Sequence, residues 1–130
     1  MPDDPRILKL IGMWWAGAAE DLAVARQSRT HPRASSFHSQ QAVEKAIKSL
    51  LVQQQQKFEK THDIGDLLSL LNKAGIIAPT AEIDGLTELT QFAVETRYPP
   101  RNVTAEEAKD ALAKAERFLL WVRQQLPKEV

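Results

Sequence analysis

One helix-length stretch, residues 36–51, carries two stripes of side chains at helical spacing. The first stripe, here called the polar row, consists of His38, Gln41, Lys45 and Lys48. The second stripe is apolar and consists of Val43, Ala46, Ile47 and Leu50. Residues three or four apart share one face of a helix, so each stripe forms a continuous surface. Imidazole, amide and ammonium groups in a row can bind a phosphate or move a proton. The same groups can also form a plain solvated face, and this stretch alone leaves both interpretations open.

A second candidate site is the pair Arg97 and Tyr98, which precedes two consecutive prolines. The guanidinium fork of an arginine matches a phosphate, and an aromatic ring offers a stacking surface to a base. The pair also has a purely structural interpretation. An arginine can neutralise the C-terminal end of a helix, and a tyrosine can close the end of a helical bundle.

These candidates need a scaffold, and the apolar periodicity of the chain predicts an all-α one. The expected helices span about 6–27, 36–57, 61–74, 80–96 and 105–126. The expected cap residues are Ser35 or Ser36, Thr61, Gly75 and Thr104, the last in a capping box with Glu107. We therefore predict an up-and-down bundle of four long helices plus one shorter helix. Residues 1–5 are expected to be a disordered N-terminus and residues 6–127 a single helical domain.

Composition limits the function classes. The 130 residues include 17 basic and 17 acidic side chains, and this balance argues against a general nucleic-acid binder while allowing a local basic site. The chain has no cysteine, an acidic and proline-rich start, and no apolar run long enough for a membrane span. We therefore expect a cytoplasmic protein without membrane contact. The three histidines lack ligand spacing, so we expect no metal and no cofactor.

Asp21 is ambiguous on sequence grounds. It lies beside Leu22, at the edge of the apolar face of the first expected helix. It is either a solvated charge or a partly buried polar partner for the second helix.

Three separated motifs, in this order, resemble the HEPN domain of small prokaryotic proteins. The motifs are Phe37-His38-x-Gln40-Gln41-Ala42-x-Glu44-Lys45-Ala46-x-Lys48, Thr61-His62-Asp63 and Thr96-Arg97-Tyr98-Pro99. The resemblance covers about residues 12–124. It implies a bundle of four or five helices that is usually dimeric. It also implies frequent pairing with a minimal nucleotidyltransferase, often as toxin and antitoxin. Many such domains are metal-independent ribonucleases, and others are proposed to bind nucleotides or RNA.

The family's catalytic signature is an arginine followed a few residues later by a histidine, before the last helix. Arg97 matches the arginine, but Asn102 stands where the histidine is expected, and no histidine follows it. Asparagine forms hydrogen bonds but does not titrate, so it cannot act as a general acid or base. The resemblance therefore favours a binding pocket over strong nuclease activity.

The favoured hypothesis is a dimer that binds RNA or a nucleotide and works with a nucleotidyltransferase. Its expected ligand-binding residues are Tyr98, Gln41, Glu44, Lys45, Lys48, Asp21 and His62, with Arg97 holding phosphate and the two acidic residues orienting the basic groups. An alternative is an active endoribonuclease toxin that uses Arg97, Asn102 and His38, with His38 or His62 in the proton-transfer role. A further alternative is a structural dimerisation module without a ligand.

Overall fold

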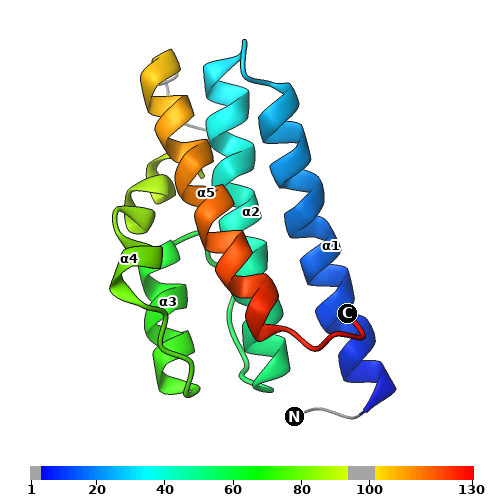
Figure 1. Ribbon diagram of the computed structural model, residues 1–130. Helices are drawn as coiled ribbons and strands as arrows, with labels where there is room; N and C mark the ends of the chain where they lie inside the picture. Colours follow the sequence, from blue (N-terminus) through cyan, green and yellow to red (C-terminus); the bar gives the residue numbers. More distant parts are fainter. Residues whose placement is uncertain (1–3, 94–101) are drawn as a thin grey trace.

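The computed structural model describes residues 4–93 and 102–130, and all regular structure within them is helical (Figure 1). Three long helices lie side by side: α1 (Pro5–Gln27), α2 (Pro32–Gln53) and α5 (Ala105–Gln125). The shorter elements are α3 (Ile64–Lys73), α4 (Thr80–Ile83) and the 3₁₀-helix η1 (Leu86–Phe92). The predicted all-α bundle is confirmed. No helix in the described ranges is both long and apolar enough to cross a membrane.

Helix α2 is the centre of the bundle, because α1, α3, α5 and η1 all pack against it. The side chains of its predicted apolar stripe, Val43, Ala46, Ile47 and Leu50, are fully buried. This central position also buries polar side chains of α2, among them Gln40, Glu44 and Lys48. Most buried polar groups in proteins have hydrogen-bond partners, and Gln40 and Lys48 donate to Glu44 within α2 itself.

Helix α1 ends at the predicted residue and begins one residue earlier than predicted. Pro5 is its first residue, where a missing backbone N–H costs nothing. Asp4 is the N-cap and accepts hydrogen bonds from the side chain and the backbone N–H of Arg6. These bonds hold the pKa of the Asp4 carboxyl below its usual value. Asp4 and Pro5 thus belong to the start of the helix, and residues 1–3 lie outside the described residues.

Helix α2 begins earlier and ends earlier than predicted. It starts at Pro32, because proline suits the first position of a helix, so the predicted N-cap at Ser35 or Ser36 is wrong. Ser35 instead donates its hydroxyl to the carbonyl of Ala25 in α1. The helix ends at Gln53, four residues before the predicted end. Gln55 then adopts a φ of 53°, a left-handed conformation that stops helical hydrogen bonding.

Helix α3 begins later than predicted. Its N-cap is Asp63, whose side chain accepts from the backbone N–H of Asp66, and not Thr61. The hydroxyl oxygen of Thr61 instead accepts from the backbone N–H of Asp63. Gly75 follows the helix with a φ of 99°, so the predicted C-terminal glycine is confirmed.

The single helix predicted over 80–96 is wrong within the described residues. The segment divides into α4 and η1, because Asp84 is extended and Gly85 has a φ of 70°. Residues 94–96 lie outside the described ranges. The last helix agrees with the prediction: Thr104 and Glu107 form the capping box at the start of α5.

Candidate polar site on helix α2

Asp21 connects α1 to the polar row. Its Oδ1 lies 2.8 Å from His38 Nδ1, and its Oδ2 lies 2.7 Å from Lys45 Nζ. The first contact is a hydrogen bond, and the second is an ion pair outside hydrogen-bond geometry. Asp21 is 8% exposed, so it is the buried partner of α2 and not a solvated charge. This settles the ambiguity of its position at the edge of the apolar face.

Glu44 forms a second cluster one turn further along. Its Oε2 accepts a hydrogen bond of 2.9 Å from Lys48 Nζ, and its Oε1 lies 2.7 Å from His62 Nδ1. Gln40 donates to the same Oε1 at 3.2 Å and to the backbone carbonyl of His62. Glu44 is 4% exposed, and Lys48 is 5% exposed. This buried carboxylate therefore fixes the loop before α3 against the middle of α2.

Two aromatic residues complete the surroundings of Lys48, and the sequence did not indicate them as site residues. The Lys48 ammonium lies 5.3 Å from the ring centroid of Trp14 and 5.7 Å from that of Phe58. The two rings meet edge to face, with centroids 5.9 Å apart. Trp14 recurs at helical spacing with Ile11 and Ala18 in α1, and this spacing was the available signal. No pattern in the sequence connected Phe58 with it.

Helix α1 follows the polar row along α2. Asp21 contacts His38 and Lys45, and Trp14 contacts Lys48. Between them, a Cβ atom on Gly17 would lie 3.2 Å from Lys45 Cδ, so the glycine leaves room for the lysine stem. Gln41 is half-buried, and its Oε1 has no hydrogen-bond partner within the described part of the chain.

The two clusters differ in what they offer to a ligand. The side chains of His38 and Lys45 are 30% and 31% exposed, and that of His62 is 59% exposed, whereas Lys48 is enclosed. A carboxylate oxygen accepts hydrogen bonds, so Nδ1 of each histidine is the donor in these contacts. The second ring nitrogen, Nε2, takes no part in either contact. The accessible groups are therefore one ammonium and two imidazoles oriented by buried carboxylates.

Three predicted site residues remain to be placed: Arg97, Tyr98 and Asn102. Arg97 and Tyr98 lie outside the described residues. Asn102 is exposed, two residues before the Thr104 cap of α5. Among residues 4–93 and 102–130, no three histidine, cysteine, aspartate or glutamate side chains form a group that could hold a metal ion.

Comparison with known proteins identifies the family. A family model described as the HEPN domain matches residues 11–125. The chain belongs to the HEPN family. The match extends from within α1 to the last residue of α5, so the HEPN unit includes Asp21, Glu44 and the whole polar row.

Solved structures similar to this HEPN protein include two prokaryotic proteins. One is ST0689, an archaeal HEPN homologue, which is 29% identical with a TM-score of 0.69; the likeness covers 88% of this chain and 96% of that chain. The other is TT1696 from Thermus thermophilus, which is 28% identical with a TM-score of 0.77; the likeness covers 89% of this chain and 98% of that chain. No curated protein matches the chain in sequence.

Proposed function

We propose that this HEPN protein binds RNA or a nucleotide through the polar row of α2 together with Arg97 and Tyr98. In this proposal it is a cytoplasmic homodimer that works with a minimal nucleotidyltransferase in a toxin–antitoxin-like pair. One observation supports the proposal most: the buried carboxylates Asp21 and Glu44 hold two lysines and a histidine of α2, and a histidine of the loop before α3. A helix face that served only solubility would not need buried partners.

The residues divide into contact groups and supporting groups. Lys45 and His38 are accessible enough to meet a phosphate, and Arg97 would supply a bidentate fork beside the stacking ring of Tyr98. Lys48 is too enclosed to reach a ligand, so its role is to hold Glu44. His62 would add a hydrogen-bonding group at the edge of the site.

Binding can be tested with fluorescein-labelled single-stranded RNA and with ATP, measured by fluorescence anisotropy and calorimetry. Arg97→Ala should weaken binding of the active ligand about tenfold or more, because a charged hydrogen bond is lost. Arg33→Ala is the matched control, an exposed arginine at the start of α2 outside the polar row. Binding that Arg97→Ala leaves intact would remove Arg97 from the site. If the protein forms a dimer but binds neither RNA nor ATP, the result would favour the structural dimerisation module without a ligand.

A second candidate function is a metal-independent ribonuclease, which the Asp21–His38 contact favours. Nε2 of His38 would take the proton of a 2′-hydroxyl, the resulting oxygen would attack the adjacent phosphorus, and the 5′-oxygen would leave with a proton from water. Arg97 would stabilise the charge on the phosphoryl oxygens. This arrangement would place on His38 the proton transfer that Asn102 cannot perform.

The ribonuclease candidate is tested by incubating RNA with the protein in a chelator. His38→Gln should slow cleavage by about 10²–10⁴-fold, which is typical for loss of a general base. His31→Gln is the control, because His31 is exposed and, within the described residues, its side chain forms a hydrogen bond with the neighbouring Thr30 only. Equal cleavage by both variants, or none by the wild type, would end this candidate.

The partnership with a nucleotidyltransferase has its own test. The reading frame beside this one would be co-expressed, and the two products would be purified together. If the partner adds nucleotides to a tyrosine of this protein, the mass shift must map to Tyr98, which is the one tyrosine of the sequence. A shift mapped elsewhere would remove that idea.

A further inference from the structure

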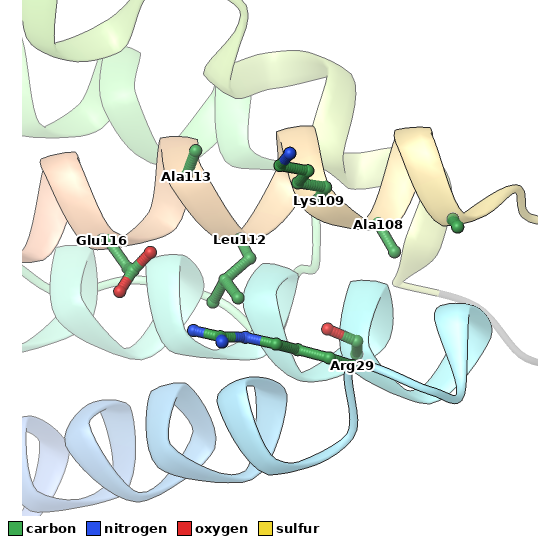
Figure 2. Close-up of a pocket in the computed structure, with 8 residues that line it drawn as sticks. Arg29, Ala108, Lys109, Leu112, Ala113 and Glu116 are labelled. Carbon is green, nitrogen blue, oxygen red and sulfur yellow. The ribbon is translucent and has the colours of Figure 1, made fainter.

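A cavity of about 470 Å³ lies between the α1–α2 turn and α5 (Figure 2). Its lining residues are Arg29, Ser35, Ala105, Ala108, Lys109, Leu112, Ala113 and Glu116. None of the residues placed in the α2 site above is among them. The volume falls in the range of small-molecule pockets, roughly 300–1,000 Å³.

The α5 wall of this cavity is made mainly of short apolar side chains. Ala105, Ala108 and Ala113 border it, and Leu112 projects from α5 toward the α1–α2 turn (Figure 2). Ala108 and Leu112 are each only 5% exposed, so their side chains are held in place by packing against the bundle. A flat or compact apolar group would pack against this wall.

Arg29 supplies the charge. Its side chain extends beneath α5, with the guanidinium near Leu112 and turned toward Glu116 (Figure 2). No hydrogen bond or ion pair engages Arg29 within the described part of the chain. Glu116 forms no ion pair with Arg29 within the described residues, and its Oε2 accepts a hydrogen bond of 2.8 Å from Arg26 Nε. Arg29 and Lys109 are the two cations that line the cavity, and in this view the amino group of Lys109 points away from Arg29.

We propose that this cavity binds a small organic anion whose carboxylate or phosphate meets the Arg29 guanidinium and whose apolar body packs on Ala108 and Leu112. A guanidinium presents two parallel N–H donors, which match the paired oxygens of either head group. The apolar wall excludes a ligand that is polar throughout. The site is separate from the α2 polar row, so the proposal stands whether or not RNA binds there.

The proposal is tested with 1-naphthyl phosphate, 1-naphthoate and the neutral 1-naphthol, titrated into ¹⁵N-labelled protein and followed by NMR. At least one of the two anions should shift the amide signals of Ala108 and Leu112 and saturate, and the anion that binds more tightly identifies the head group. Arg29→Gln should lower the affinity for this anion about tenfold, since a charged hydrogen bond is lost. Arg33→Gln is the control, because Arg33 is an exposed arginine four residues away that does not line the cavity.

A second variant tests the apolar part. Ala113→Trp fills the cavity from its exposed rim and should abolish the shifts, while Ala23→Trp, on an exposed part of α1, should not. Several results would overturn the proposal: no saturable shift with either anion, equal affinity for 1-naphthol, or equal effects of Arg29→Gln and Arg33→Gln. Displacement of the bound anion by single-stranded RNA would also overturn it, because the cavity would then belong to a nucleic-acid surface.

Discussion

Glu44 holds three side chains at once. It accepts from Lys48 and Gln40 and contacts His62, and it is itself almost completely buried. A buried charge that loses its only counter-charge is strongly destabilising, because it remains desolvated without compensation. Glu44 therefore supports the fold as well as the geometry of the site.

We expect Glu44→Ala to lower the free energy of unfolding by about 3 kcal/mol, because Lys48 would stay buried without a partner. The measurement is urea denaturation followed by circular dichroism. Glu88→Ala is the control, since the Glu88 side chain is 67% exposed in its ion pair with Lys114. That variant should lose less than about 1 kcal/mol. Equal losses in the two variants would contradict the buried role of Glu44.

The sequence predicted the members of the polar row but not their partners. Spacing along one helix placed His38, Lys45 and Lys48 on a common face. Spacing could not show that Asp21 of α1 contacts His38 and Lys45, because those contacts depend on how the two helices pack. The Arg29 cavity had no sequence signal either, since three of its lining residues are alanines that look like ordinary helix formers.

At the scale of elements, Gly85 divides the segment predicted as one helix. Its φ of 70° is a left-handed conformation, and a Cβ there would lie 2.7 Å from Lys114 Nζ. The hydrogen bond from Lys114 to Asp110 raises the pKa of Lys114, and Lys114 also contacts Glu88 in η1. Apolar periodicity continued through this point, so the pattern alone suggested an unbroken helix.

Two glycine substitutions should have opposite effects on stability. Gly85→Ala should cost about 1–2 kcal/mol, because alanine disfavours the left-handed conformation. Gly12→Ala, within α1 where no atom would contact the added Cβ, should add about 0.5–1 kcal/mol by favouring the helix. Thermal unfolding midpoints measure both changes. Stabilisation by Gly85→Ala would show that the break between α4 and η1 is not required.

The capping box of α5 gives a prediction at the same scale. The Thr104 hydroxyl accepts from the backbone N–H of Glu107, and the Glu107 carboxylate accepts from the backbone N–H of Thr104. Thr104→Ala should therefore cost about 1 kcal/mol of stability, and Thr104→Ser should cost little. Thr87→Ala, at an exposed position of η1, serves as the control in the same denaturation experiment. A loss in the control as large as that of Thr104→Ala would argue against the cap.

At the scale of the whole molecule, the chain combines zero net charge with a local set of oriented basic groups. The fold class followed from apolar periodicity, and the family match over residues 11–125 agrees with it. The function cannot be derived from the fold class in the same way, because one fold supports several activities. The HEPN scaffold places the polar row on α2, and the proposed ligand would meet the few groups exposed there.

The salt dependence of RNA binding tests the central proposal most directly. The affinity for labelled single-stranded RNA would be measured by fluorescence anisotropy across a salt series for wild type, Lys45→Gln and Lys128→Gln, the last replacing an exposed lysine near the C-terminus. Loss of one phosphate contact should reduce the slope of log affinity against log salt by about 0.7. We predict this reduction, with weaker binding, in Lys45→Gln only. RNA binding with the same slope and affinity in all three proteins would contradict the α2 site.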